Sequence, residues 1–178
     1  VIAANLEKKI KAELERMLKD DREKYETFYA AFGRQLKFGL VSDYGMHKDL
    51  LQDLVEFRSD KEGKDITLKE YCDAMPESQK HIYFATGDSA ARLSQLPQTQ
   101  LLRERGFDVL LMTEQVDTFI PQTLNTYAEH EFRNILTDDL DLATEEEKKA
   151  AEEKAKAFQS GVEFRHGVLR EGGPVARA

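Results

Sequence analysis

Apolar residues in the first forty positions recur at the spacing of two amphipathic helices. In the first set they return every fourth residue, at Ile2, Leu6, Ile10, Leu14 and Leu18. A second set continues at helical spacing through Tyr25, Phe28, Phe32, Leu36 and Leu40. Because one face of an α-helix repeats every three to four residues, we predict two helices. Asp21 stands between them and is expected to cap the second.

The next stretch predicts further helices joined by a loop. Residues 50–55 carry leucines and a valine at helical spacing, and the polar, glycine-containing residues 59–65 are expected to form a loop. Thr67 followed by Glu70 has the spacing of a capping box at the start of a short helix. Residues 1–75 are therefore predicted to form a helical lobe.

Two short apolar runs change the pattern after residue 76. Residues 80–86 and 107–112 are too short for helices, and each leads through small or polar residues into a helical pattern. This order is typical of buried parallel strands joined by helices, and a third strand is expected at 132–136. We predict an α/β fold in which the helical lobe precedes a small three-layer αβα sandwich, residues 76–140, with a short and mostly parallel sheet.

The helices around these strands have their own start and stop signals. Asp88 and Ser89 can cap one helix, and Gly106 is expected to end another in a left-handed conformation. A helix is predicted over residues 118–127, with Pro121 tolerated in its first turn. Residues 141–178 are rich in Glu, Lys and Ala and then in Gly, which predicts a charged helix or linker followed by a disordered tail.

Composition narrows the functional classes. A net charge of −8 argues against nucleic-acid binding, which needs a basic surface. No apolar run is long enough to span a bilayer, so no membrane partner is expected. The single cysteine, Cys72, excludes an internal disulfide, fits a cytoplasmic location and is expected to be buried and inert. The chain starts without Met, in an amphipathic pattern, so we expect it to be part of a longer protein.

Candidate catalytic and metal-binding motifs are weak. Thr86-Gly87-Asp88-Ser89 could form an anion site at a helix N-terminus, but the glycine patterns of nucleotide-binding loops are missing and capping explains these residues. The histidines are scattered, at His47, His81, His130 and His166. We therefore expect no metal site and no catalytic residues.

Four segments together carry a resemblance to a known family. They are FYAAFGRQLKFGL at 28–40, LVEFRSD at 54–60, EYCDAMPESQKHIYFATGDS at 70–89 and LPQTQLLRERGFDVLLMTEQVDTF at 96–119. In this order they resemble the middle domain of the Hsp90 chaperone family, in its bacterial form. The resemblance extends from residue 1 to about residue 158, and the tail beyond departs from the family pattern.

The resemblance implies what this chain contains and what it lacks. The family's middle domain has a large α/β sandwich, a helical coil and a smaller α/β sandwich, and this chain resembles the last two. The nucleotide pocket and the catalytic loop would lie outside the chain, so no enzymatic activity and no cofactor are expected in it, whereas the parent would bind ATP and Mg²⁺. Expected partners are unfolded client proteins and the N-terminal ATPase and C-terminal dimerisation domains of a homodimeric parent.

The resemblance also places a client-binding site. Residues 116–122 match an exposed amphipathic helix through which family members contact clients. By position, Phe119 corresponds to an exposed bulky residue and Gln122 to a polar contact, with Ile120 beside them in the expected set. The sequence departs from the family in having Phe where bacterial relatives often have Trp, and in carrying Pro121. The alternative is that Phe119 and Ile120 simply pack on the sheet.

Two other functional classes stay open at this point. One is a small doubly wound nucleotide-binding enzyme domain that uses the turn at residues 86–89. The other is a helical adaptor whose interaction surface is formed by residues 1–75. The leading hypothesis is a chaperone fragment that binds clients and couples the ATPase and dimerisation domains in protein folding and the stress response.

Overall fold

Two long helices begin the chain and pack against each other. The computed structural model describes residues 2–42, 44–140 and 142, and it separates two units, residues 1–139 and 140–178. Helix α1 covers Ile2–Asp20 and α2 covers Arg22–Val41. Asp21 caps α2 as predicted, since its carboxylate accepts a hydrogen bond from the Lys24 backbone N–H at 3.3 Å. The predicted helix, linker and tail at 141–178 lie almost wholly outside the described residues.

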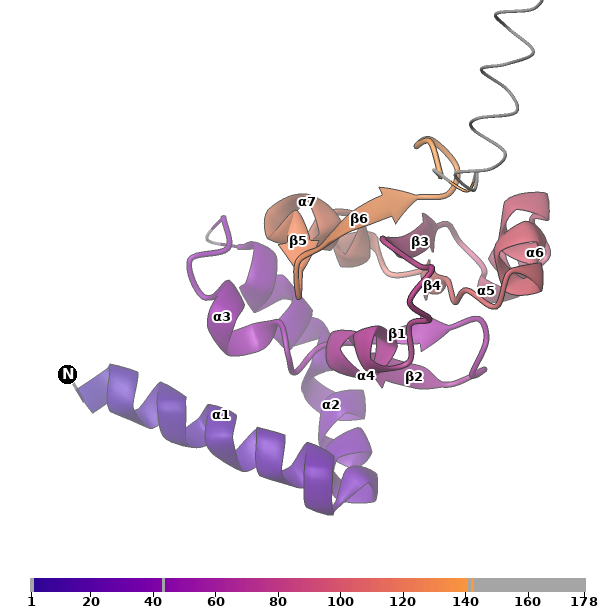
Figure 1. The fold of residues 1–178 in the computed structure, drawn as a ribbon. Helices are drawn as coiled ribbons and strands as arrows, with labels where there is room; N and C mark the ends of the chain where they lie inside the picture. The colour runs from indigo at the N-terminus through magenta and orange to yellow at the C-terminus, as the bar shows by residue number, and fades with distance from the viewer. Residues whose placement is uncertain (1, 43, 141, 143–178) are drawn as a thin grey trace, which may run out of the picture. The chain divides into compact units, whose positions relative to one another are not determined.

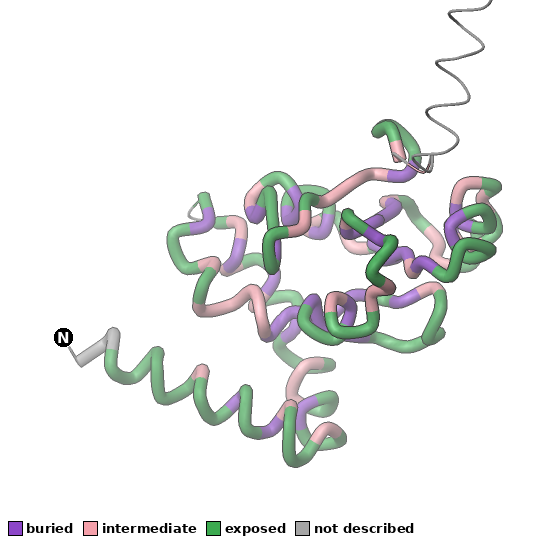
Figure 2. Tube along the Cα trace, viewed as in Figure 1, coloured by how far each residue is buried: buried purple, intermediate pink, exposed green. Residues whose placement is uncertain are grey.

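The predicted apolar face of these helices is buried only in part. A cluster of Leu14, Met17, Tyr25 and Leu54 joins α1 and α2 to the segment after α3, which covers Lys48–Leu51. The Tyr25 hydroxyl donates a hydrogen bond to the Leu54 carbonyl. Most of α1 faces solvent, as the exposure colours of Figure 2 show, and Leu6 and Ile10 are exposed.

A mixed sheet forms the centre of the first unit (Figure 1). Within the described residues, six strands are joined in the order β2-β1-β4-β3-β6-β5. They cover Glu56–Ser59 (β1), Asp65–Thr67 (β2), Ile82–Thr86 (β3), Leu110–Met112 (β4), Thr126–Tyr127 (β5) and His130–Asn134 (β6). Strand β3 is parallel to both β4 and β6, whereas the remaining pairs are antiparallel. The predicted α/β class is confirmed, but the sheet that was expected to be mostly parallel is mixed, with its parallel pairs on either side of β3.

The hairpin β1–β2 was not predicted. Residues 56–67 lie in the part of the chain expected to be helical, and residues 59–65 were expected to form a loop. Instead β1 pairs with β2 and, through Arg58 and Ser59, with β4. The two strands are too short to give an alternating pattern, and the pairing of β1 with β4 joins residues about fifty positions apart, which no local pattern reveals.

Short helices connect the strands. They cover Leu68–Asp73 (α4), Ala90–Ser94 (α5), Pro97–Glu104 (α6), Gln115–Thr118 (the 3₁₀ helix η1) and Ile120–Leu124 (α7). The capping box of Thr67 and Glu70 begins α4 as predicted, and Gly106 has the expected positive φ, +78°. The single helix predicted over residues 118–127 is instead η1 followed by α7, because the chain turns at Asn125 (φ +59°) into β5.

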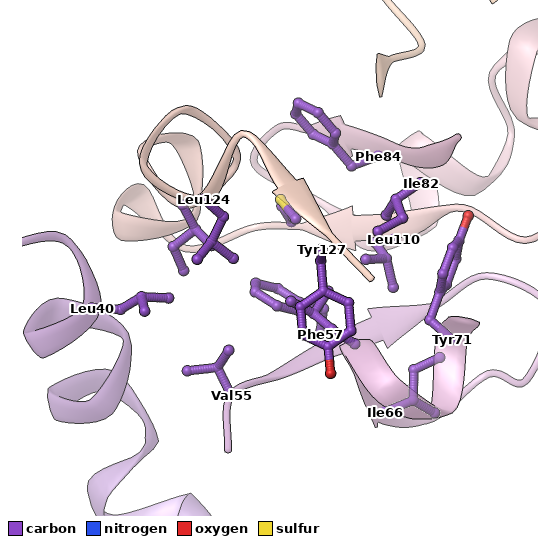
Figure 3. Packing of buried hydrophobic residues seen from close by; sticks show 13 residues of the cluster. Leu40, Val55, Phe57, Ile66, Tyr71, Ile82, Phe84, Leu110, Leu124 and Tyr127 are labelled. Carbon is purple, nitrogen blue, oxygen red and sulfur yellow. The ribbon is translucent and has the colours of Figure 1, made fainter. Parts of the chain in front are cut away.

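Helices cover both faces of the sheet. Alternate residues of β3 and β4, including Ile82, Phe84 and Leu110, join a cluster with residues of α2, α4 and α7. Figure 3 shows Leu40 of α2, Phe57 of β1 and Leu124 of α7 converging on it. Helices α5 and α6 lie elsewhere along the sheet (Figure 1), where Leu93 and Leu102 are buried. None of the described helices has the length and apolar composition required to cross a membrane.

Candidate functional site

The segment predicted to bind clients begins directly after β4. Residues 113 and 114 leave the carboxyl end of this strand, and η1 and α7 then turn back toward the core. Pro121 lies in the first turn of α7, as predicted. Ile120 and Leu124 are buried in the main apolar cluster and fix one side of α7 to the protein. The opposite side of the segment faces solvent.

The structure separates the three predicted site residues. Phe119 is 56% exposed, although it is a large apolar side chain, and Gln122 is also exposed. Ile120 is 0% exposed and packs in the core, which agrees with the alternative that this residue packs on the sheet. While the protein is folded, Ile120 therefore cannot contact a partner, whereas Phe119 and Gln122 can.

A groove lies between Phe119 and the C-terminal part of α2. Its volume is about 510 Å³. Its apolar lining comes from Phe38, Val41, Val116 and Phe119, and its polar lining from Arg34, Ser42, Glu114 and Gln115. Phe38 is 63% exposed, so two aromatic side chains from segments eighty residues apart line one open groove.

Phe38 was missed in the sequence, although a signal for it exists. Leu36 and Leu40 belong to the predicted apolar face of α2, and both pack on or within the main cluster. Phe38 stands midway between them, and two residues correspond to about 200° around a helix, so its side chain must point away from that face. An aromatic residue on the polar side of an amphipathic helix is therefore the sequence signal for this part of the groove.

A buried cation holds the turn to α2. The Lys37 side chain is 5% exposed, and its Nζ lies 2.8 Å from Asp117 Oδ1 and 3.0 Å from Glu114 Oε1. The same Nζ is 4.7 Å from the centre of the Phe57 ring on β1. Lys37 thus contacts both acidic residues of the turn and the sheet beneath it.

The two carboxylates also organise the turn internally. The Glu114 backbone N–H donates to Asp117 Oδ2 at 3.1 Å, and Glu114 and Asp117 form a reciprocal capping box around η1. Burial raises the pKa of Asp117 above its ordinary value despite the neighbouring Lys37. Burial also acts to raise the pKa of Glu114, but hydrogen bonds and charge from Lys37 and Arg34 outweigh it and lower that pKa.

The turn at residues 86–89 is explained by helix capping. Ser89 accepts the Arg92 backbone N–H at 3.5 Å, and the Gly87 N–H donates to the Met112 carbonyl at 3.1 Å. Leu93 packs so close to Gly87 that a Cβ there would lie 3.0 Å from it. The helix that follows, α5, has only five residues and offers little room for a phosphate site.

Other candidate chemistry is equally limited. Among the described residues, no group of three or more His, Cys, Asp or Glu side chains could hold a metal ion. His130 Nδ1 lies 2.9 Å from the Lys80 carbonyl, and His166 is outside the described residues. Cys72 is half-buried, and burial raises the pKa of its thiol to about 11, so it is a poor nucleophile near neutral pH.

Comparisons with known proteins agree with the fold. A family model described as Hsp90 protein matches residues 1–172. The chaperone protein HtpG of Bacillus subtilis (strain 168) is 47% identical over 171 residues, which cover 96% of this chain and 27% of that protein. HtpG of Clostridium perfringens (strain 13 / Type A) is 48% identical over 157 residues, which cover 88% and 25%.

A solved structure gives the same result. The middle domain of a Plasmodium falciparum heat shock protein matches with a TM-score of 0.70 and 28% identity, over 77% of this chain and 57% of that one. The chain spans about a quarter of the length of the curated relatives it matches. These matches do not favour the alternative of a doubly wound nucleotide-binding enzyme domain.

Proposed function

The chain belongs to the Hsp90 protein family, and we propose that it binds unfolded client segments in the groove between α2 and the η1–α7 turn. The observation that carries this proposal is the pair Phe38 and Phe119, which stay largely exposed on either side of one groove. Folded proteins seldom leave large apolar side chains grouped in this way unless the surface binds something.

The chemistry of the groove suits an unfolded polypeptide. Such a chain exposes bulky apolar side chains that a folded protein would bury, and the two aromatic rings provide matching apolar surface. Its backbone N–H and C=O groups also need partners. Gln115 lines the groove and Gln122 follows on α7, and both carry exposed side-chain amides that can donate and accept. Because neither interaction depends on a defined client sequence, the groove can serve many clients.

The rest of the parent's activity would reside in other domains. We propose that a longer, homodimeric and cytoplasmic chaperone contains this segment between an ATPase domain and a dimerisation domain. ATP and Mg²⁺ would bind to the ATPase domain, and nucleotide state there would reorient the groove. Calorimetry with millimolar ATP tests whether nucleotide binding resides in the ATPase domain, because this chain alone should then give no binding heat.

Titration with an unfolded probe tests the client site directly. Reduced, carboxymethylated lactalbumin remains unfolded in water and is added to the ¹⁵N-labelled chain while amide shifts are followed by NMR. The proposal predicts the largest shift changes at residues 115–122 and around Phe38. Shift changes centred on α1 or α3 would instead favour the helical adaptor, and an absence of shift changes would contradict client binding by this chain.

A further inference from the structure

A lysine of α2, Lys37, joins this helix to residues 114–119, which form the client-binding turn. Lys37 Nζ contacts Asp117 at 2.8 Å and Glu114 at 3.0 Å, and both Lys37 and Asp117 are buried. Phe119 follows Asp117 by two residues, and its backbone N–H donates to the Val116 carbonyl at 3.1 Å inside the same turn. The exposed aromatic ring is thus mounted on a turn whose two acidic residues share one cation.

We propose that Lys37 is a positioning residue that sets where Phe119 stands in the groove. This inference rests on the proposed function, since it concerns how the client site is built. Lys37 does not itself face the groove, whereas the next residue in α2, Phe38, lines it. Through this one pair of neighbours, α2 supplies one aromatic side of the groove and fixes the turn that supplies the other.

A stabilising role alone does not account for a lysine at this position. Burying an ion pair costs desolvation energy that its attraction often fails to exceed, and well-packed apolar residues of similar volume are commonly as stable. The surroundings of Lys37 would suit such a residue, since the Phe57 ring lies beside it and Leu36 and Leu40 pack on or in the core. A buried ion pair can instead be retained because it selects one relative arrangement of the two elements that it joins.

The network has the geometry needed for such a selection. One Nζ reaches residues three apart, Glu114 before η1 and Asp117 within it, so both ends of the turn are fixed relative to α2. The capping box also links the same two residues to each other by hydrogen bonds. An apolar side chain at position 37 would fill space but would leave the turn free to shift, and Phe119 would move with it.

The test compares Lys37→Met with a matched ion-pair variant elsewhere, Arg103→Met. Arg103 on α6 binds Asp60, whose side chain is also buried, with N···O contacts of 2.7 and 2.8 Å. Both variants remove a cation from a buried carboxylate, but only Lys37 touches the client-binding turn. Affinity for reduced, carboxymethylated lactalbumin is measured by fluorescence anisotropy at a temperature where circular dichroism shows both variants folded.

The expected result is a dissociation constant at least about fivefold higher for Lys37→Met, and less than about twofold higher for Arg103→Met, fivefold being about 1 kcal/mol. The double variant Lys37→Met/Asp117→Asn adds a second readout. It removes a buried carboxylate that has lost its cation, so it should regain thermal stability, but its affinity should stay low because the turn is still not fixed.

Any other outcome contradicts either the positioning role of Lys37 or the proposed client binding. If the unaltered chain binds the probe and Lys37→Met binds equally well, or if the double variant regains affinity together with stability, Lys37 is structural and the positioning role is wrong. If Arg103→Met weakens binding as much as Lys37→Met, general destabilisation is the cause. If the unaltered chain does not bind the probe, both the positioning role and the proposed function fall.

Discussion

The turns that follow β3 and β4 both lead from a parallel strand into a helix, but they are stabilised by different kinds of contact. Strands β3 and β4 run parallel, with Thr86 opposite Met112, and each is followed by a turn into a helix. The first turn is completed by nearby residues, since Ser89 caps α5 and Leu93 packs against Gly87. The second depends on Lys37, which comes from a helix about eighty residues earlier in the chain.

The surfaces beyond the two turns differ accordingly. After the first turn, the exposed large apolar residue on α6 is Leu101, at 42%. After the second, Phe119 stands at 56% and lines a groove together with Phe38. A strand, turn and helix therefore do not locate function by themselves. The distant cation and the grouped exposed aromatics distinguish the second turn, and the predictions below test that distinction.

The largest expected effect concerns the buried side of the second turn. Ile120→Ala should lower the free energy of unfolding by about 2–5 kcal/mol, because it leaves a cavity in the main cluster. Phe119→Ala, one residue earlier, should change it by less than about 0.5 kcal/mol, as is usual for an exposed position. Urea unfolding followed by circular dichroism measures both. Similar losses of unfolding free energy in the two variants would mean that the Phe119 side chain packs in the core and is not exposed to a partner.

A smaller effect is expected at the first turn. Ser89→Ala removes the side-chain oxygen that caps α5 and should cost about 0.5–1 kcal/mol of stability. Since no residue of this turn lines the groove, the affinity for the unfolded probe should not change. A weaker affinity in Ser89→Ala, at a temperature where the variant is folded, would remove the distinction between the two turns.

The smallest expected effect is a pH dependence specific to the second turn. The pKa of Glu114 is lowered in the folded protein, so its contribution to stability is present above the unfolded value of 4.5 and is lost as the pH falls through the folded value. The stability difference between the unaltered chain and Glu114→Gln should therefore shrink from pH 6 to pH 3. With this side chain partly exposed, the change should be below about 0.5 kcal/mol. A difference that grows in acid would contradict the assignment.

Local sequence signals predicted much of the fold. The strands β3 and β4, the caps at Asp21 and Ser89 and the capping box of Thr67 and Glu70 all depend on residues close in sequence. The hairpin β1–β2 was not predicted because its strands are very short and because β1 pairs with β4, far along the chain. The helix predicted over residues 118–127 was too long because Asn125, a residue type that often adopts positive φ at helix ends, was not used as a stop signal.

The candidate site was predicted less completely than the fold. Family resemblance proposed Phe119, Ile120 and Gln122, of which Phe119 and Gln122 are exposed and Ile120 is a core residue. Neighbouring residues of a helix point about 100° apart, so one can face the core while the next faces solvent. Phe38 was visible in principle as an aromatic residue off the apolar face of α2. The role of Lys37 could not be seen, since a lysine in an amphipathic helix normally faces solvent and its partners lie 77 and 80 residues away.

The most direct test of the client-binding claim compares Phe119→Ala with Leu101→Ala. Both truncate an exposed apolar side chain on the segment after a parallel strand, but only Phe119 lines the groove. With reduced, carboxymethylated lactalbumin as the probe, Phe119→Ala should raise the dissociation constant at least about fivefold, the loss expected for a central binding residue, and Leu101→Ala should leave it unchanged. Equal affinities in all three proteins, or a larger loss in Leu101→Ala, would contradict the account.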